Sequence, residues 1–435
     1  MFDFYYFLQQ LSHYFRHFVL SEPLLQILIL TPAFWIEYPW YFLMTILPFF
    51  HRVFPSYLQD YSPPVGIIVT AYREPSSDIL RNLRTILYQD YPGKIEIVLI
   101  FDSPRDVTFF KNLELPARRF LKVISKYYRG GRASSLNLGL KLLSPEIEIV
   151  LAVDADTSLD YDALRLLLRP FSNPRVIAVS GNIKVRNAKD SIWTRFQHIE
   201  YVISIALARL TLSRLFGTVN NISGAYGAFR RGFLELVYGW DSGTAEDLDL
   251  TARLKIAASF YPEARFAFVP ESVARTSVPE TFAGLIKQRQ RWDGDLVWLF
   301  FKKYRRFLVP AFPNWRDFFL FLDLNLLLQF VMPVAMFVYN VYLWLNYGLV
   351  GLLVVDLFIL AVYALWTLVM YFSYLLTISR ERAYDLSFFG YLLIYPLYNW
   401  ILRLHALKAY FDDWCGDLHK YSSYVPRWVS RRLPF

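Results

Sequence analysis

The chain has 435 residues, of which 55% are hydrophobic and 19% aromatic, and its formal net charge is +9. This apolar content is too high for an ordinary water-soluble domain and predicts a membrane protein. The charge suits contact with anionic headgroups and nucleotides, and because no nucleic-acid-binding motif accompanies it we expect no nucleic-acid partner. A single cysteine, Cys415, excludes an intramolecular disulfide and a cysteine-based metal cluster.

The longest apolar runs lie toward the two ends of the chain. Residues 1–20 mix Tyr and Phe with His and Arg, which predicts an amphipathic helix at the membrane surface. Three stretches reach the roughly 20 apolar residues that a crossing helix needs: 24–50, 324–345 and 348–377. A fourth stretch, 386–404, contains Pro396 and Arg403, so it either crosses the membrane or forms a broken, re-entrant helix.

Basic residues flank these stretches on one side. They lie in the middle region, in the loop after residue 377 and in the segment after residue 404. Because cytoplasmic loops carry an excess of Lys and Arg, all three should be cytoplasmic, in which case 386–404 does not fully cross. We therefore predict an integral membrane protein, of the plasma membrane, whose middle domain faces the cytoplasm.

The sequence divides into five predicted parts. An interfacial helix and the first span are followed by a globular α/β domain, interfacial helices, a C-terminal membrane region and a basic cytoplasmic tail: 1–50, 51–295, 296–322, 323–410 and 411–435. In the globular domain, β-branched runs alternate with helical stretches: 65–70, 78–88, 95–101, 122–126, 133–143, 147–153 and 162–168. This alternation predicts a mostly parallel sheet with helices on it, whose ligands bind beyond the carboxyl ends of the strands.

Polar side chains follow the first two predicted strands. Thr70, Tyr72 and Glu74 offer a hydroxyl, an aromatic face and a carboxylate where a nucleotide base can lie. Asp102 follows the second strand. A strand-end aspartate often caps a turn or the next helix instead, so the position of Asp102 alone leaves both interpretations open.

Further along, a glycine-hinged basic loop opens a predicted helix. Residues 128–137 contain Gly130, Gly131 and Arg132. Helix N-termini and arginine side chains both favour phosphate. The loop does not match the phosphate-binding loop of nucleotide hydrolases, so that activity has no support.

Two carboxylates directly follow the apolar run 147–153. Asp154 and Asp156 are two residues apart, so in an extended chain they point to one face and can address one site. Mg²⁺ and Mn²⁺ take oxygen ligands and share them with a ligand's phosphates, so one or two carboxylates suffice. We favour a metal site; the alternative is a solvated turn in which Asp156 or Thr157 caps the following helix.

The last two motifs lie on predicted helices. After a small-residue-rich segment, 221–231, comes a helix start with Glu246 and Asp247. Asp247 either completes a capping box with Thr244 or serves as a base whose charged form the helix dipole favours, and the two roles are compatible.

The run 288–292, if helical, places Gln288, Arg291 and Trp292 on one face. Arg291 can then hold a diphosphate, while Trp292 offers a platform to a sugar ring. An isolated run of this kind is more often an amphipathic helix at headgroup level.

Taken together and in this order, the motifs resemble the membrane-integrated family 2 glycosyltransferases with a GT-A fold, the group that contains cellulose, chitin and hyaluronan synthases and ceramide glucosyltransferase. The resemblance covers about residues 63–295 and the flanking membrane segments. The sequence departs from the usual motifs in three places: Arg73 replaces an Asn, Asp102 lacks its usual acidic neighbour, and Thr244 is displaced by one position.

The resemblance implies a role for each motif residue. The donor, a nucleotide sugar, would contact the following residues: Thr70, Tyr72, Glu74, Asp102, Arg132, Asp154 and Asp156. Asp156 would also hold Mg²⁺ or Mn²⁺, and Asp247 would be the catalytic base of an inverting transfer that forms a β-linkage. The acceptor channel and the diphosphate would involve Glu246, Gln288, Arg291 and Trp292.

The acceptor is either a growing polysaccharide or a membrane lipid, with a UDP-sugar as the expected donor. A chain with so few spans makes a wide secretion channel hard to build from one copy. From other classes, a silent membrane scaffold or a transporter compete; transporters place ionisable residues in their spans, and here only Asp356 lies well inside one. No feature of the sequence indicates an oligomeric state.

Overall fold

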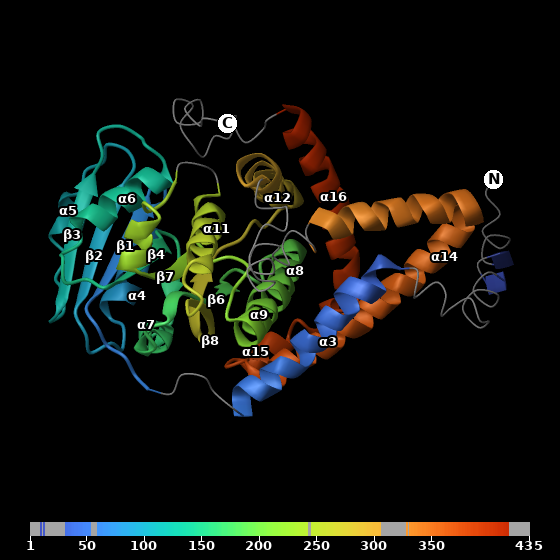
Figure 1. The fold of residues 1–435 in the computed structure, drawn as a ribbon, viewed down its shortest axis with the longest axis horizontal. Coiled ribbons are helices and arrows are strands. Elements are labelled where there is room, and N and C mark those ends of the chain that lie inside the picture. Colours follow the sequence, from blue (N-terminus) through green and yellow to red (C-terminus); the bar gives the residue numbers. More distant parts are fainter. Residues whose placement is uncertain are drawn as a thin grey trace.

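The computed structural model describes residues 31–53, 59–241, 245–305 and 330–416, together with positions 9, 10, 12, 13 and 328. An α/β domain built on one eight-stranded sheet lies beside a group of long helices that projects from it (Figure 1). The predicted surface helix over 1–20 falls almost entirely outside the described residues.

The sheet is mixed, with a parallel half and a half that changes direction. Its strand order is β3-β2-β1-β4-β7-β6-β8-β5. The strands are β1 (Val65–Ala71), β2 (Ile95–Phe101), β3 (Arg119–Ser125), β4 (Ile149–Asp154), β5 (Ser158–Leu159), β6 (Val176–Val185), β7 (Tyr226–Arg230) and β8 (Arg265–Thr276). The first four in spatial order run parallel, whereas β7 is antiparallel to both β4 and β6. The prediction of a mostly parallel α/β sheet is confirmed.

The register brings the ends of three strands level with one another. Thr70 on β1 pairs with Asp154 on β4, and Ala71 pairs with Phe101 on β2. The strands β1 and β2 are buried along their whole length, as expected for β-branched runs covered on both faces. The polar residues that follow them therefore emerge at one edge of the sheet, as the sequence predicts.

Helices cover the sheet and link it to the projecting part. Those of the α/β domain are α4 (Ser76–Leu87), α5 (Thr108–Lys111), α6 (Arg132–Leu142), α7 (Ala163–Leu168), η1 (Arg169–Ser172), α8 (Ile192–Tyr201), the π-helical η2 (Val202–Leu207), α9 (Ala208–Phe216), α10 (Arg231–Leu236), α11 (Glu246–Ser259), α12 (Phe282–Val297) and the π-helical η3 (Trp298–Lys303). The run α8–η2–α9 packs on β6 and β8 and also reaches the long helices α3 (Pro32–Val53) and α14 (Met332–Thr377).

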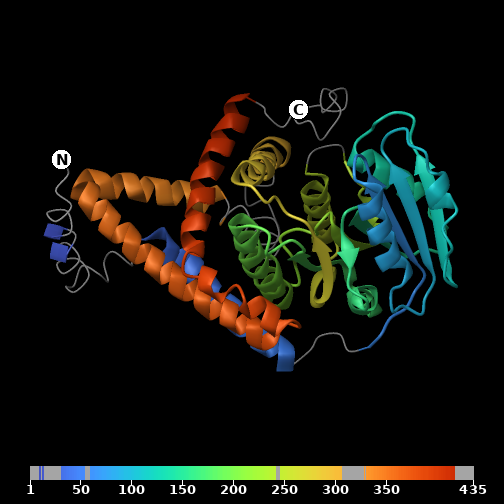
Figure 2. The same ribbon diagram turned by 180° about the vertical axis from the view of Figure 1, so that it is seen from behind.

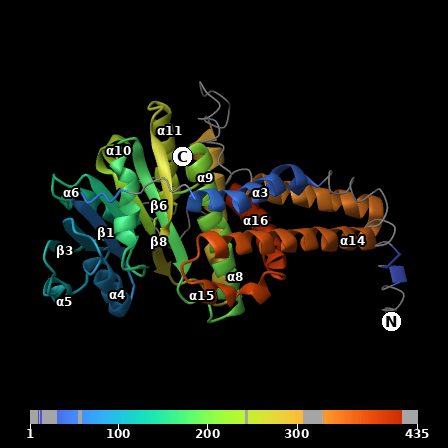
Figure 3. The same ribbon diagram turned by 90° about the horizontal axis from the view of Figure 1, so that it is seen from below.

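The projecting part is organised around a helical hairpin. Gly348 adopts a φ of 65° and a ψ of −176° and divides α14 into two legs, a conformation that glycine reaches without strain. Helices α3 and α16 (Tyr395–Gly416) pack against α14 (Figure 2). Seen from below, α3 and α14 extend away from the sheet (Figure 3).

Among the described residues, α14 is the one helix long and apolar enough to cross a membrane. Large apolar side chains are exposed along both legs, including Phe337, Leu345, Leu365 and Phe372. Exposed apolar surface of this extent is typical of contact with a membrane or a partner. The break at Gly348 lies where the sequence separates the stretches 324–345 and 348–377, whereas the predicted span 24–50 begins outside the described residues.

Several predicted stretches differ from the observed helices in their bounds. The stretch 386–404 is not one helix: the short α15 (Arg382–Leu386) and η6 (Phe389–Tyr391) precede α16, which agrees with the broken alternative. Helices also run through the predicted boundaries at 50, 295 and 410, because α3, α12 and α16 continue past them. Neither Asp156 nor Thr157 caps the next helix, since α7 starts at Ala163 with Asp162 as its N-cap.

A buried ionic cluster joins the end of the hairpin to the α/β domain. Asp385 on α15 is fully buried and lies 3.4 Å from both Lys184 on β6 and His198 on α8. It also accepts hydrogen bonds from the Ser379 hydroxyl at 2.5 Å and the Tyr374 hydroxyl at 3.0 Å. Burial raises the pKa of the Asp385 carboxyl, but His198 and Lys184 outweigh burial and lower it to about 2.

Candidate active site

The Asp154–Asp156 turn is held by its backbone. The Asp154 carbonyl accepts hydrogen bonds from Asn82 Nδ2 and from the Thr157 amide, both at 3.0 Å. The Asp156 carbonyl accepts one from Arg186 Nη2 at 2.7 Å. Both carboxylates therefore sit on a fixed turn that does not use them for its own hydrogen bonding, apart from a 3.3 Å contact between Thr157 Oγ1 and Asp156.

The electrostatics of this turn suit a cation. Burial, together with the charges of Asp154 and Glu74, raises the pKa of Asp156 to about 6. A divalent ion would relieve this repulsion and would find the oxygen donors that Mg²⁺ and Mn²⁺ prefer. Within the part of the chain that the structure describes, no three His, Cys, Asp or Glu residues gather to hold an ion. The donor set thus fits an ion that shares its coordination with a ligand's phosphates.

Arg132 connects the turn to the helix α11. Its Nη2 lies 2.6 Å from Asp154 Oδ1 and donates to the Gly224 carbonyl at 2.7 Å, while Nη1 donates to Glu246. Burial lowers the pKa of Arg132, but Asp154 and Glu246 outweigh it and hold the pKa above its usual value. Burial in turn raises the pKa of Glu246. The sequence assigns Arg132 to the donor and Glu246 to the acceptor side; the structure brings the two together.

Asp247 receives hydrogen bonds from the segment before β7. Its Oδ2 accepts from the Gly224 amide at 2.9 Å and from Asn221 Nδ2 at 3.2 Å. Its Oδ1 accepts from the Leu248 amide in the first turn of α11 at 2.8 Å, so positioning and helix stabilisation coexist. Among the described residues no side chain caps α11, whose N-cap is Ala245; Thr244 lies outside them. Because Gly224 also binds Arg132, one glycine joins the Asp154 side to Asp247.

Asp102 organises the basic loop rather than facing an open site. It is 4% exposed and accepts hydrogen bonds from Lys126 Nζ at 2.5 Å and from the amides of Gly130 and Gly131 at 3.0 and 2.7 Å. The Ser135 hydroxyl adds a fourth at 3.1 Å. Any contribution of Asp102 to ligand binding is therefore made through the loop that it holds.

The residues after β1 form the neighbouring wall. The Arg129 guanidinium lies 4.0 Å from the ring centre of Tyr72. Glu74 accepts hydrogen bonds from the amides of Tyr72 and Arg73 at 2.6 and 3.1 Å, which folds the turn back on itself. Thr70 is buried on β1. These residues meet at the same edge of the sheet as Asp102 and Asp154.

The run 288–292 lies in the middle of α12, as the sequence predicts. Arg289 is buried, lies 4.5 Å from the ring of Trp292 and forms a 2.8 Å ion pair with Glu200 on α8. Gln288 keeps a buried Oε1 atom without a hydrogen-bond partner among the described residues. Because α12 packs on α16 and its Arg289 is buried, one face of α12 is covered by the rest of the protein.

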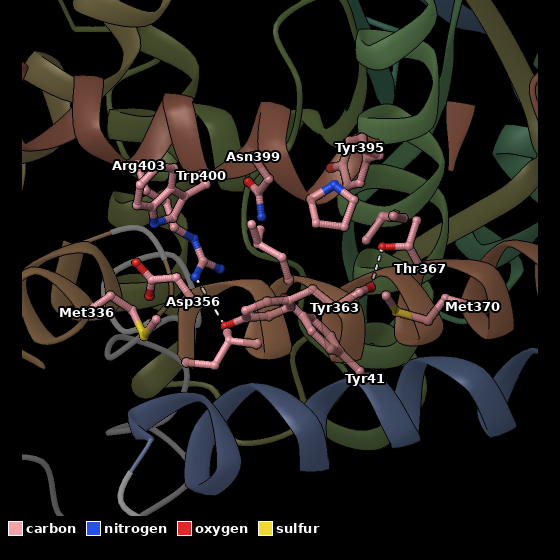
Figure 4. Close-up of a pocket in the computed structure, with 14 residues that line it drawn as sticks. Tyr41, Met336, Asp356, Tyr363, Thr367, Met370, Tyr395, Asn399, Trp400 and Arg403 are labelled. Carbon is pink, nitrogen blue, oxygen red and sulfur yellow. Dashed lines mark hydrogen bonds between the residues drawn. The ribbon is translucent and has the colours of Figure 1, made fainter. Parts of the chain in front are cut away.

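A pocket lies between the long helices (Figure 4). Aromatic rings of Tyr41, Tyr363, Tyr395 and Trp400 line it together with polar groups, among them Asp356. Helix α16, which lines the pocket, is also linked to α12. Tyr398 on α16 donates a hydrogen bond at 2.8 Å to Glu200, and Glu200 forms the ion pair with Arg289 on α12. Polar groups and aromatic faces are thus available inside the projecting part.

Three further residues were missed by sequence reasoning. Asn82 and Arg186 hold the Asp154–Asp156 turn. Asp249 on α11 accepts from Lys303 Nζ at 2.6 Å and from the Tyr304 hydroxyl at 2.7 Å, which joins α11 to η3. Asp249 lies two residues after Asp247, so its place next to a predicted site residue could have drawn attention to it. Nothing near Asn82 or Arg186 in the sequence indicates their partners.

Comparison with known proteins identifies the family of this chain. The family model described as "Glycosyltransferase like family 2" matches residues 63–294. The chain belongs to glycosyltransferase family 2. A chitin synthase model also matches residues 245–420 of this family 2 protein, which covers α11, α12, α14 and α16.

The names of curated relatives of this family 2 protein refer to N-acetylglucosamine. The poly-β-1,6-N-acetyl-D-glucosamine synthase of Staphylococcus epidermidis is 33% identical over 52% of this chain and 53% of the relative. The N-acetylglucosaminyltransferase of Azorhizobium caulinodans is 30% identical over 53% of this chain and 59% of the relative. The matches thus span a little over half the length of these relatives.

A solved structure supports the fold of the family 2 protein. A mannosyltransferase from Pyrobaculum calidifontis, in complex with GDP-mannose and Mn²⁺, covers 90% of this chain at a TM-score of 0.56 and 20% identity. The GT-A-type α/β fold expected from the sequence is confirmed.

Proposed function

We propose that this family 2 protein is an inverting glycosyltransferase that moves a sugar from a nucleotide diphosphate, a UDP-sugar, to a hydroxyl of a growing polysaccharide at the membrane. The observation that carries the proposal is the bridge through Gly224, which binds Arg132 by its carbonyl and Asp247 by its amide. The bridge connects two groups of residues. On one side are Arg132, suited to a diphosphate, and the Asp154 carboxylate paired with it, suited to a metal; on the other is the Asp247 carboxylate, suited to act as a base. The names of the relatives favour N-acetylglucosamine as the first sugar to test.

The chemistry follows from these groups. Asp247 accepts the proton of the acceptor hydroxyl, whose oxygen attacks the anomeric carbon as the bond from that carbon to the diphosphate oxygen breaks. Attack from the opposite face inverts the anomeric centre and gives a β-linkage from an α-linked donor. Arg132 stabilises the negative charge of the departing nucleotide diphosphate. A bound Mg²⁺ or Mn²⁺, held by Asp156 with Asp154 beside it, would neutralise charge on the same phosphates.

On the acceptor side the proposal uses α12. Gln288 has a buried oxygen that can accept a hydroxyl hydrogen bond, and Trp292 and Arg291 lie next to it on the same helix. Glu246 contributes through Arg132 rather than through direct contact with the acceptor. The predicted base-side residues Thr70, Tyr72 and Glu74 form the wall of the donor site, and Asp102 supports that wall through the basic loop that it holds.

The protein is proposed to be integral to the plasma membrane, with the α/β domain on the cytoplasmic side where nucleotide sugars are made. The long apolar hairpin α14 supports membrane insertion, and the basic residues around it support this orientation.

A single transfer to a membrane lipid is the second candidate. The pocket between α3, α14 and α16 favours it (Figure 4), because a lipid acceptor must present its headgroup from within the helical part. Product size separates the two candidates: label from the donor either migrates as polymer or extracts with lipid.

The first experiment is a screen of UDP- and GDP-sugars with Mg²⁺ or Mn²⁺, scored by released nucleotide and by label in polymer or lipid. Release that depends on metal, acceptor and one sugar nucleotide is expected. Donor binding without turnover on any acceptor would instead identify a silent scaffold.

A further inference from the structure

The Asp154–Asp156 turn lies at the boundary between the two halves of the sheet. It follows β4 of the parallel half, yet the next strand, β5, pairs with β8 at the far edge of the mixed half, with Ser158 opposite Arg275. The turn therefore bridges the sheet, and its position depends on side chains from both halves.

From the mixed half, Arg186 reaches the turn. It follows β6, and its Nη2 donates to the Asp156 carbonyl at 2.7 Å, to Ser158 Oγ at 3.0 Å and to the Arg275 carbonyl at 2.6 Å. These contacts fix the peptide that carries the Asp156 side chain but leave its carboxylate available. A guanidinium suits this task because it offers several donors in one rigid plane.

Arg275, the neighbour of Arg186, is in turn fixed by two acids. Its guanidinium makes a paired contact with Asp160, at 2.8 and 3.0 Å. Its Nη2 also donates to Glu381 at 2.9 Å. Glu381 follows the hairpin α14 directly and precedes α15, and it receives a second contact from Lys184 at 3.3 Å. A continuous set of contacts thus runs from the end of the hairpin to the backbone of Asp156.

We infer that Arg186 is a positioning residue for the metal-binding carboxylate of Asp156, and that Glu381 couples this position to the end of the apolar hairpin. The inference rests on the proposed function, since it requires a metal-dependent sugar-nucleotide site at this turn. Its consequence is that the affinity for the metal depends on how the hairpin end is seated on the sheet.

The test measures Mn²⁺ binding rather than turnover. The full chain in detergent is titrated with Mn²⁺ in the presence of UDP, and free Mn²⁺ is followed by electron paramagnetic resonance. Arg186→Gln removes the positive charge and shortens the side chain that reaches the Asp156 carbonyl, and we expect affinity for Mn²⁺ to fall about tenfold, the effect of about 1.4 kcal/mol. Arg186→Lys keeps one cationic donor and should restore part of this loss. Glu381→Gln should lower the affinity about threefold, since it weakens a contact one step further away.

The matched control is Glu263→Gln, which breaks the exposed ion pair with Arg175 at 3.0 Å. It should bind Mn²⁺ as the wild type does. Unchanged Mn²⁺ affinity in Arg186→Gln overturns the inference, whatever its turnover. If that variant fails to fold, Arg186→Lys and Glu381→Gln decide, and unchanged affinity in both overturns it. If the wild-type chain binds no Mn²⁺ in the presence of UDP or GDP, that result would instead contradict the proposed function itself.

Discussion

The parallel and mixed halves of the sheet are held in different ways. In the parallel half, Asp102 and the basic loop bind each other across short sequence distances, and their contacts stay within the α/β domain. In the mixed half, Lys184 and Arg275 bind Glu381 and Asp385 from the segment after the hairpin. The first half is thus held by contacts within the α/β domain, whereas the second is also attached to the segment that follows the hairpin.

Under the proposed function, this difference corresponds to a division between two tasks. Donor chemistry needs a rigid surface, which local hydrogen bonds of the kind around Asp102 provide. Acceptor delivery needs the domain to be fixed against the helices that lead to the membrane, and only long-range contacts achieve that. Four changes test this division, from the largest expected effect to the smallest.

Asp247→Asn removes the proposed base at the junction of the halves. We expect turnover to fall about a thousandfold, within the range for loss of general-base catalysis, while the Kd for the donor changes little because the amide keeps the shape of the side chain. Steady-state kinetics and calorimetry with the donor measure both quantities. Asp106→Asn, at an exposed carboxylate bound to Thr108, is the control, and substantial turnover by Asp247→Asn would contradict the assignment.

Asp385→Asn weakens the attachment of the mixed half. Because it leaves Lys184 without one of its buried partners, it should destabilise the protein by about 3 kcal/mol. Thermal unfolding in detergent measures this loss, and the exposed Asp190→Asn nearby is the control. If the division is correct, the protein that remains folded still binds the nucleotide. A loss of nucleotide affinity as large as the loss of stability would show that the halves are not separate.

The same cluster makes stability sensitive to acid. Burial lowers the pKa of His198, so the unfolded chain takes up a proton near the ordinary histidine pKa of about 6.5 before the folded chain does. Stability should therefore fall as the pH drops below about 6.5, by at most about 1.4 kcal/mol per pH unit. Denaturant unfolding from pH 7.5 to 5 measures how the free energy of unfolding changes with pH. His198→Gln should make this dependence weaker. An unchanged dependence in that variant would mean that other groups cause it.

Gly224→Ala disturbs the bridge without changing a charge. An added Cβ would lie 2.7 Å from Arg132 Nη1, so the guanidinium must move. At a cost of about 1 kcal/mol for crowding, we expect roughly fivefold weaker donor binding, measured as KM and by calorimetry. Gly232→Ala, where an added Cβ meets nothing within 4 Å, should leave KM unchanged.

Sequence reasoning succeeded where chemistry follows directly from a local pattern. The strands β1, β2 and β4 and the residues behind them were predicted within a few positions, because an apolar run and its polar end are adjacent in the chain. The two legs of α14 were predicted for the same reason, since length and hydropathy are local properties.

The contacts that attach the mixed half were not predictable in this way. Lys184 and Asp385 are 201 residues apart, and Arg275 and Glu381 are 106 apart. Each looks like an ordinary surface charge until the fold pairs them. The same holds for Asn82 and Arg186, whose partners at the Asp154–Asp156 turn are backbone carbonyls, which carry no sequence signal.

The two legs of the hairpin differ in length, and this difference affects how the hairpin would fit a bilayer. Residues 348–377 form a leg about 45 Å long at 1.5 Å per residue, whereas the hydrocarbon layer is about 30 Å thick. If one end lies at the far surface of the bilayer, the last turns stand clear of the lipid, where Tyr371 and Tyr374 meet α15. Lipids with longer acyl chains would draw these turns inward and press the sheet toward the headgroups, so acyl-chain length would act on the protein from outside the candidate site.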